Sequence, residues 1–181
     1  MINIDADGLL VDWKGYVIEN HFPYMTIEEL NAMDADKRQK LLRQMYADDP
    51  QLFYKLEPLE GAAEFMQRII SLGEPWRILT SAGTDHPDFD VAAESKIQNL
   101  KKHFGISREH ITVTESSSAK ADYVENRGDI LIDDFLRNVL QWVENRGVGV
   151  HFTAAKGYEA ALAEVCESLD CSIPEAMAIT L

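Results

Sequence analysis

Residues 2–12 of this chain read Ile2-Asn3-Ile4-Asp5-Ala6-Asp7-Gly8-Leu9-Leu10-Val11-Asp12. Apolar residues that favour a β-strand stand directly before two carboxylates, and the glycine that follows lets the backbone turn sharply. Two interpretations fit this stretch alone. Asp7-Gly8 is a common turn between antiparallel strands, but acids at the end of a strand also indicate a catalytic loop. The other strands of the chain have to decide between them.

Apolar runs and helical patterns alternate along the rest of the chain. After a first strand at residues 1–5, short apolar runs predict strands at 76–81, 111–113, 129–132 and 147–152. Helical periodicity lies between and after them, at 62–72, 91–104, 121–126, 135–145 and 157–169. Strands that alternate with helices form βαβ units, whose parallel strands are apolar throughout. The sequence therefore predicts an α/β fold with a three-layer, Rossmann-like parallel sheet.

Polar residues follow three of the predicted strands. They are Asp5 and Asp7, Thr80 and Ser81, and Asp133 and Asp134, with Lys120 on a neighbouring polar loop. In a parallel sheet the carboxyl ends of the strands meet at one edge, where ligands bind. A single site at this edge explains all three groups, whereas a hairpin at Asp7-Gly8 explains only the first. We therefore interpret the opening stretch as a catalytic loop.

The acids at this edge predict a metal ion. Four carboxylates that converge without a counter-ion repel one another. Mg²⁺ is suited to remove this repulsion because it binds carboxylates together with phosphate and water oxygens. The predicted metal ligands are Asp5, Asp7, Asp133 and Asp134. Because Asp133-Asp134 precede a predicted helix, one of them can also cap the helix N-terminus.

Residues 14–57 differ in character from the rest of the chain. Thr26 precedes an acid-rich helical turn, a second helical pattern covers 36–46, and aromatic residues are frequent. We expect a small helical cap at 14–57, inserted into a core made of residues 1–13 and 58–181. Most of its aromatic side chains are expected to form the cap's own core, since a short segment needs large side chains to bury enough area.

The composition limits the partners and the location. The 181 residues carry a formal net charge of −14, which repels a nucleic-acid polymer, and the densest basic cluster, at 96–102, is expected to be a modest helix face. No apolar run has the length of a membrane span and no signal segment opens the chain, so we expect a cytoplasmic protein without membrane contact.

Cys166 and Cys171 lack histidine neighbours at metal-ligand spacing and are expected to be plain thiols. A homodimer is compatible with the sequence.

Four motifs stand in order along the chain and identify a family. They are Asp5-Ala6-Asp7-Gly8, Thr80 after Ile78-Leu79, Lys120, and Asp133-Asp134 after Ile130-Leu131-Ile132. In these motifs the chain resembles the haloacid dehalogenase-like (HAD) phosphohydrolases. More narrowly, it is similar to their 5′(3′)-deoxyribonucleotidase branch at residues 53–62, Leu79-Thr80-Ser81, 129–134 and Phe152-Thr153-Ala154. The likeness covers nearly the whole chain up to about residue 154.

The resemblance implies a Mg²⁺-dependent phosphomonoesterase with a covalent intermediate. Asp5 would attack phosphorus and form an aspartyl-phosphate, which divides a difficult displacement into two easier ones. Asp7 would protonate the leaving alkoxide and then deprotonate the attacking water, with its backbone carbonyl on the metal. Thr80 would hydrogen-bond the phosphoryl oxygens and Lys120 would neutralise their charge. The two acids of the fourth motif would hold the Mg²⁺, directly or through water.

The same resemblance implies the substrate and its contacts. The expected partner is a small phosphomonoester, a (deoxy)ribonucleoside monophosphate, whose base needs a flat apolar slot. The expected contacts are Trp13, Phe53, Thr80, Ser81 and Lys120. The chain departs from the branch at Ala82, where a proline is common, and at Ser118-Ala119, where Arg-Asp is common. These departures bear on phosphate affinity and on sugar and base preference.

Two alternatives to a nucleotidase stay open. The same catalytic machinery could act on a sugar phosphate or another small metabolite, or the fold could serve as a catalytically silent binding module. The complete set of motif residues argues against silence. A hydrolysis screen over both kinds of phosphomonoester, with and without Mg²⁺, separates these functions.

Overall fold

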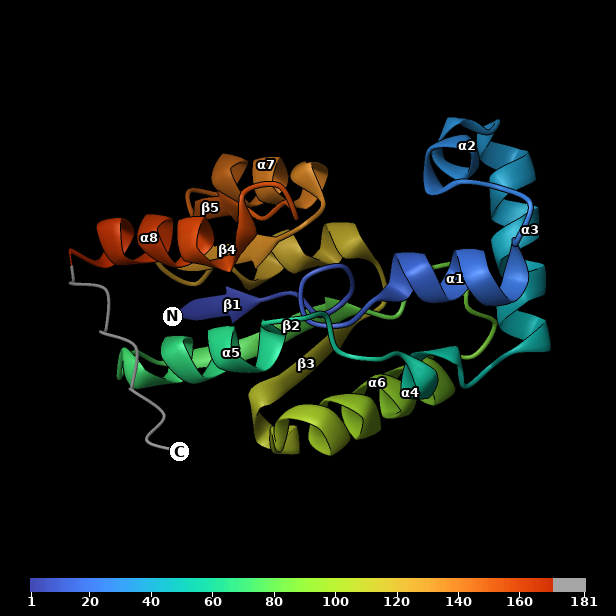
Figure 1. Ribbon diagram of the computed structural model, residues 1–181. Coiled ribbons are helices and arrows are strands. Elements are labelled where there is room, and N and C mark those ends of the chain that lie inside the picture. Colours follow the sequence, from blue (N-terminus) through green and yellow to red (C-terminus); the bar gives the residue numbers. More distant parts are fainter. Residues whose placement is uncertain (171–181) are drawn as a thin grey trace.

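The computed structural model describes residues 1–170 and contains a five-stranded sheet in the order β3-β2-β1-β4-β5 (Figure 1). The strands are β1 (Ile2–Ile4), β2 (Trp76–Ser81), β3 (Ile111–Thr114), β4 (Ile130–Asp133) and β5 (Val148–His151). Every pair of neighbours in this sheet is parallel. This confirms the predicted α/β fold, and β1 lies at the centre of the sheet.

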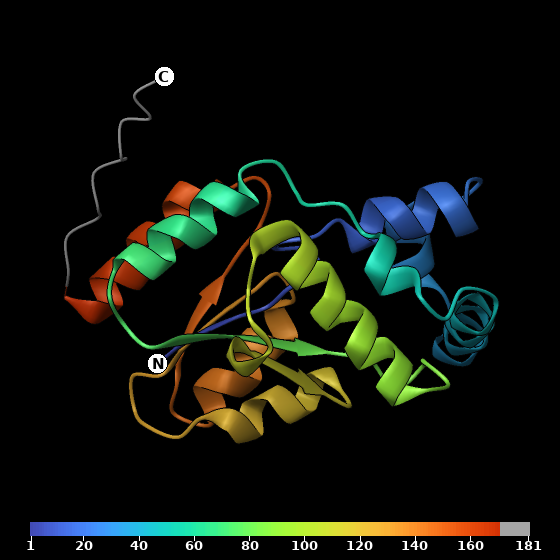
Figure 2. The same cartoon turned by 90° about the horizontal axis from the view of Figure 1, so that it is seen from below.

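Helices cover both faces of the sheet and make three layers (Figure 2). One face carries α5 (Ala62–Ser71), α6 (Phe89–Phe104) and α8 (Gly157–Leu169), and the other carries α7 (Leu136–Glu144) and the 3₁₀ segment η2 (Ser117–Tyr123). A short 3₁₀ turn, η1 (Arg108–His110), precedes β3. The strands are buried on both sides, which is why they read as continuous apolar runs rather than as alternating ones.

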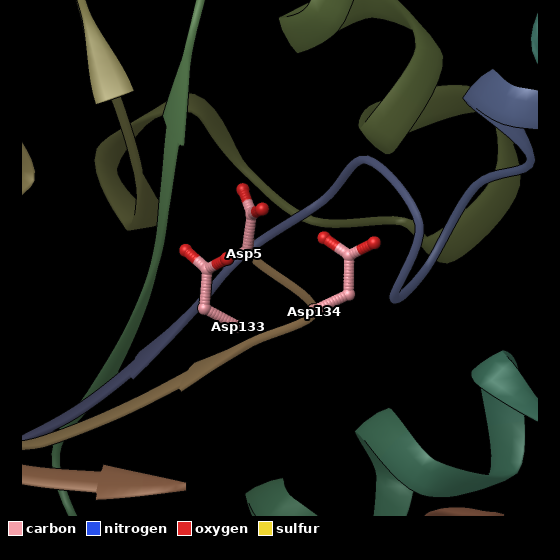
Figure 3. A group of neighbouring side chains, drawn as sticks. All are labelled: Asp5, Asp133 and Asp134. Carbon is pink, nitrogen blue, oxygen red and sulfur yellow. The ribbon is translucent and has the colours of Figure 1, made fainter. Parts of the chain in front are cut away.

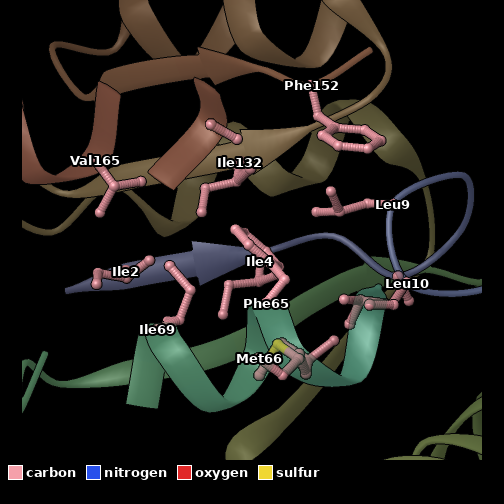
Figure 4. Packing of buried hydrophobic residues seen from close by; sticks show 14 of the residues in the cluster. Ile2, Ile4, Leu9, Leu10, Phe65, Met66, Ile69, Ile132, Phe152 and Val165 are labelled. Atoms are coloured by element: carbon pink, nitrogen blue, oxygen red, sulfur yellow. The ribbon is translucent and has the colours of Figure 1, made fainter. Parts of the chain in front are cut away.

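The main core lies between the sheet and the α5, α6 and α8 layer (Figure 4). Ile2 and Ile4 of β1 are fully buried there against Phe65 and Ile69 of α5. On the opposite face, Leu79, Leu131 and Trp142 form a smaller cluster. Successive side chains of a strand point to opposite faces, so β4 packs into both clusters, through Ile130 and Ile132 on one face and Leu131 on the other.

The segment between β1 and α5 is helical, as predicted. It contains α1 (Trp13–His21), α2 (Ile27–Ala32), α3 (Ala35–Asp48) and α4 (Leu52–Lys55). Thr26 caps α2 and forms a reciprocal capping box with Glu29. Aromatic side chains of the segment share a hydrophobic cluster in which Tyr46 stacks on Phe53, with 5.6 Å between ring centroids. The cluster also includes Ala82 and Ala92 of the core, so the cap packs on α6, while its division at residues 14 and 57 stays a prediction.

Two further expectations concern membranes and thiols. Within residues 1–170, none of the helices combines the length and the apolar character needed to cross a bilayer. Cys166 is buried on α8, and Cys171 lies outside the described residues.

Replacing Phe65 by alanine tests the main core. The Phe65 ring is 2 % exposed and stacks on Tyr158 with 4.9 Å between centroids, so Phe65→Ala is expected to lower the free energy of unfolding by about 3–5 kcal/mol. The measurement is urea unfolding followed by circular dichroism. Ile70→Ala, on the same helix but 45 % exposed, serves as the control and should cost about 1 kcal/mol or less. Equal losses for the two variants would contradict this assignment of the core.

Candidate active site

The carboxyl edge of the sheet brings three aspartates together (Figure 3). Ile4 of β1 pairs with Ile132 of β4, and the backbone N–H of Asp5 donates to the Ile132 carbonyl at 2.9 Å. The next residue of each strand, Asp5 and Asp133, therefore lies at the same level, and Asp134 follows. One carboxylate oxygen from each of the three lies within 4.8 Å of the other two. The parallel register thus assembles the predicted acids from segments about 130 residues apart in sequence.

The loop after β1 is not a hairpin turn. The neighbours of β1 are β2 and β4, and the chain instead folds into a tight loop in which Leu10 N donates to the Ala6 carbonyl at 2.7 Å. Gly8 has a φ of +75°, and a Cβ placed there would lie 2.2 Å from Oδ2 of Asp134. Only glycine combines this φ with so close an approach at little cost. The glycine therefore lets the loop after β1 lie directly against the Asp134 carboxylate.

Lys120 is a buried counter-ion for two of the acids. Its ammonium lies 2.7 Å from Oδ1 of Asp5 and 2.7 Å from Oδ2 of Asp133, and its side chain is 2 % exposed. Burial alone would lower the pKa of Lys120, but the Asp5 and Asp133 carboxylates outweigh that effect and raise the pKa above its usual value. Lys120 is thus charged, and it balances one of the negative charges at this edge.

The two acids after β4 have different surroundings. Asp133 is fully buried: its Oδ1 accepts the backbone N–H of Phe135 at 2.8 Å, and its Oδ2 also accepts the Asn138 side-chain amide at 2.9 Å. The N-cap of α7 is Phe135, and no side chain caps this helix, so the expectation that one of the two acids caps it is wrong: Asp133 instead accepts from the backbone of the N-cap residue itself. Asp134 is more accessible and is held by the exposed ammonium of Lys14, 2.6 Å from its Oδ2.

The surroundings of these acids disfavour their charged forms. Burial, with a further contribution from the nearby Asp5 carboxylate, raises the pKa of Asp133 to about 6 and also raises the pKa of Asp134. Lys120 and Lys14 respectively oppose these shifts. Excess negative charge therefore persists at the edge after both lysines are counted, and a bound cation would relieve it.

Asp7 binds a second buried lysine that the sequence analysis missed. The Lys96 ammonium lies 2.5 Å from Oδ2 of Asp7 and 3.3 Å from Oγ1 of Thr80, and the Lys96 side chain is 2 % exposed. It also lies 4.0 Å from the centroid of the Phe53 ring. The expectation that 96–102 is simply a modest basic helix face is therefore wrong for Lys96. The signal was the helical period: Lys96 stands four residues after Ala92, and both lie on the buried face of α6.

The Asp7 carboxylate has surroundings of its own. It is not part of the group of three carboxylates, and its Oδ1 has no hydrogen-bond partner among residues 1–170. Burial raises the pKa of Asp7 and the Asp5 carboxylate adds to the shift, while Lys96 opposes it. A carboxyl whose pKa is raised in this way is suited to carry a proton at the start of a reaction and to return it later.

The second motif lies at the end of β2, beside this lysine. Thr80 is fully buried and its hydroxyl contacts Lys96, whereas Ser81 is partly exposed. Ser81 lines a cavity of about 310 Å³ together with the serines that precede Lys120, Ser116, Ser117 and Ser118. The structure therefore places the predicted second and third motifs next to each other.

The two predicted base contacts have different positions in the cap. Trp13 is partly exposed at the start of α1, and its indole N–H donates to the Tyr46 hydroxyl at 3.2 Å. Phe53 is 2 % exposed and lies beneath Lys96. In this arrangement Phe53 supports the lysine, and contact of either ring with a nucleobase stays a prediction.

A larger cavity, of about 510 Å³, opens beside Asp134. Its lining is mixed: the polar side chains are Asp12, Lys14, Glu60 and Thr153, and the apolar and aromatic ones are Leu59, Phe152, Ala154 and Tyr158. Tyr158 is fixed by a hydrogen bond of 2.6 Å from its hydroxyl to the Leu9 carbonyl. One cavity thus opens beside Asp134, and a second one opens beside Ser81.

Comparison with solved structures gives two bacterial hydrolases. A HAD family hydrolase from Deinococcus radiodurans R1, solved with bound phosphate and sodium, aligns with a TM-score of 0.56 and 13 % identity, over 96 % of this chain and 97 % of that one. A hydrolase from Pseudomonas syringae aligns with a TM-score of 0.49 and 14 % identity, over 92 % and 89 % of the two chains. No curated protein sequence matches the chain. At 13 % identity, the alignment with the Deinococcus radiodurans hydrolase shows that the two chains share a fold.

The sequence also matches a family model, and the match is extensive. The model for 5′ nucleotidase, deoxy (pyrimidine), cytosolic type C protein covers residues 2–161, which include all four motifs and both buried lysines. The chain belongs to this 5′ nucleotidase family of HAD-like hydrolases and is a phosphoric monoester hydrolase.

Proposed function

We propose that the protein is a Mg²⁺-dependent phosphatase of (deoxy)ribonucleoside monophosphates that works through an aspartyl-phosphate. One observation carries the proposal: Asp5 converges with Asp133 and Asp134 at the sheet edge, while Asp7 is held apart from them by its own buried lysine. The family match supports a nucleotide as substrate. The cytoplasmic location expected from the sequence belongs to the same proposal.

The proposed reaction has two displacements at phosphorus. A carboxylate oxygen of Asp5 attacks, the bond to the ester oxygen breaks, and Asp7 gives its proton to the departing alkoxide. Water then attacks the aspartyl-phosphate as Asp7 takes a proton from it, and the bond to Asp5 breaks. Phosphate is released and both aspartates return to their starting forms. Thr80, Ser81 and Lys120 would bind the phosphoryl oxygens.

The donor set fits a hard divalent cation. The three converging ligands are all carboxylates, and the Asp5 carboxylate adds to the rise that burial causes in the pKa of Asp133 and of Asp134. We assign Asp5 and Asp134 as direct ligands, with the Asp7 backbone carbonyl, because Asp133 already binds Lys120 and the start of α7. When bound, Mg²⁺ would offset the repulsion between the anionic nucleophile and the anionic substrate.

Lys96 is proposed to position Asp7. Its ammonium holds one oxygen of Asp7 at 2.5 Å, and the Phe53 ring and the Thr80 hydroxyl hold the ammonium. The carboxyl is thereby kept at the point where an alkoxide would leave and a water would enter. A general acid contributes only when it lies within hydrogen-bond reach of the group that it protonates.

A sugar phosphate is the second candidate substrate. The apolar and aromatic part of the lining of the cavity beside Asp134 suits a flat base better than a polyhydroxylated sugar. Trp13, which is partly exposed at the start of α1, is a flat apolar ring and supports the same choice. These observations and the family match favour the nucleotide.

A substrate screen with an active-site variant tests the proposed reaction. The wild-type protein is expected to release phosphate from nucleoside monophosphates with a higher kcat/KM than from sugar phosphates, and EDTA should abolish the release. Asp5→Asn is expected to lower kcat by about 10³-fold or more, because the nucleophile is lost. Asp122→Asn, which changes an exposed carboxylate, is the control and should be unaffected. Faster turnover of sugar phosphates would overturn the substrate, and an active Asp5→Asn would overturn the mechanism.

A second prediction concerns the buried lysine of α6. Lys96→Met is expected to lower kcat/KM by about 10²-fold or more, since Asp7 loses the group that orients it. Lys101→Met removes an exposed lysine from the same helix and should leave kcat/KM unchanged. Steady-state phosphate release is the measurement, and melting temperatures show that both variants are folded. Wild-type kinetics in Lys96→Met would show that Asp7 does not depend on this contact.

A third prediction separates backbone strain from the contact with Asp134. Gly8→Ala and Gly105→Ala each place a side chain at positive φ, +75° and +67°, but only the first meets Asp134, since nothing lies within 4 Å of a Cβ at Gly105. The positive φ alone should lower the free energy of unfolding of each variant by about 1–2 kcal/mol. Gly8→Ala alone is expected to lose the rise in melting temperature that MgCl₂ produces. The same Mg²⁺ response in both variants would remove Asp134 from the metal site.

A further inference from the structure

A polar cavity of about 310 Å³ lies at the carboxyl edge of the sheet, beside the candidate active site. Five hydroxyl side chains, one arginine and one aspartate line it. They come from the ends of β2 and β3 and the segments that follow β2, β3 and β4. The proposed reaction uses Ser81 of this lining and leaves the other side chains without a role.

The direction of the side chains of β2 places this cavity on the side of the sheet away from the buried lysine of α6. Thr80 contacts Lys96 of α6, and successive side chains of a strand point to opposite faces. Ser81 therefore points toward η2 and α7, which lie together on the other face (Figure 2). The serines 116–118 around the start of η2 and Arg137 in the first turn of α7 line the cavity with it. The cavity thus adjoins Thr80.

Arg137 is a cation without an ionic partner in the described chain. The three lysines of the candidate site, Lys14, Lys96 and Lys120, each lie 2.5–2.7 Å from a carboxylate oxygen. Arg137 is exposed, and its guanidinium forms no ion pair or hydrogen bond with any other of residues 1–170. It is therefore available to an anion from solution, whereas the charges of the lysines are already engaged by aspartates.

The hydroxyl groups of the lining also have unused hydrogen-bonding capacity. Within residues 1–170, the hydroxyls of Ser81, Thr84 and Ser117 form no hydrogen bond. A guanidinium presents its N–H donors in a fixed fork that fits phosphate oxygens, and hydroxyls can donate to the remaining oxygens. Asp85 adds a carboxylate to the lining, but this carboxylate lies 3.9 Å from Nε of Arg43 in α3, whose charge opposes it. These groups suit an oxyanion better than a cation or an apolar group.

We propose that this cavity is a phosphate subsite, in which Arg137 supplies the charge and Ser81 and Ser117 supply further donors. The inference rests on the proposed phosphatase function, which brings a phosphate group to this edge of the sheet. Two sources carry the same chemistry: the phosphate group of the ester that enters, and the free phosphate that hydrolysis releases. For either source, Arg137 determines the affinity for the phosphate group.

Calorimetric titration of the full chain with inorganic phosphate, in the presence of MgCl₂, tests the subsite without turnover. Arg137→Met is expected to raise the Kd of phosphate by about tenfold or more, because charge-assisted hydrogen bonds are lost. Arg127→Met removes an exposed arginine from a loop outside the cavity and should leave the Kd unchanged. An isotherm unaffected by Arg137→Met would overturn the proposal.

Replacing the acid of the lining should act in the opposite direction. Asp85→Asn removes a negative charge and keeps the size of the side chain, so phosphate is expected to bind about threefold more tightly. Damage to the folding of the loop would weaken binding rather than strengthen it. Unchanged or weaker phosphate binding in Asp85→Asn would place the phosphate outside this cavity and overturn the proposal.

Steady-state phosphate release distinguishes the two sources. If the phosphate group of the ester occupies the subsite, Arg137→Met should raise KM by about tenfold and leave kcat within about threefold of the wild-type value. If only released phosphate occupies it, the Ki for phosphate should rise while KM stays unchanged. A lower kcat with unchanged KM and Ki would overturn the subsite. A chain that binds phosphate through Arg137 but hydrolyses no phosphomonoester would contradict the proposed function alone.

Discussion

The Lys120 ammonium lies 2.7 Å from the carboxylates of both Asp5 and Asp133, and the geometry of the candidate active site depends on this contact. Two buried carboxylates at the ends of neighbouring strands would otherwise repel each other, and removing one partner from such a buried group leaves an uncompensated charge that is costly. Asp133 in turn binds the backbone at the start of α7. The Lys120 ammonium thus links β1, through Asp5, to β4, through Asp133, and Asp133 links both to the start of α7.

The second buried lysine divides the site into two parts with different electrostatics. Lys96 binds Asp7 and not the group of three carboxylates, so the residue proposed to carry a proton is separated from those proposed to hold the metal. The ring beneath Lys96 is Phe53, which comes from the cap. The position of Asp7 therefore depends on how the cap packs on α6. The contact with Lys96 accounts for the burial of this aromatic residue of the cap.

Much of the fold and most of the proposed site could be predicted from local patterns. The strand at 76–81 and the helix at 157–169 were predicted with the bounds that the structure has, because apolar runs and helical spacing are local properties. Asp5, Thr80, Lys120 and the acids after β4 were found because parallel strands end at one edge. Lys96 was missed because one lysine in a basic helix gives no sign of its burial unless its position is compared with the apolar face.

The sequence by itself determined the α/β class, the family and the identity of the acids, since strand ends, glycine turns and motif spacing are recorded in the order of residues. The tertiary structure decided which partner each charge has. Asp133 rather than Asp134 is enclosed by Lys120 and Asn138, and Asp7 is paired with Lys96 across 89 residues. These outcomes depend on which faces of separate elements meet, and burial and ion pairing are set by that packing rather than by neighbours along the chain.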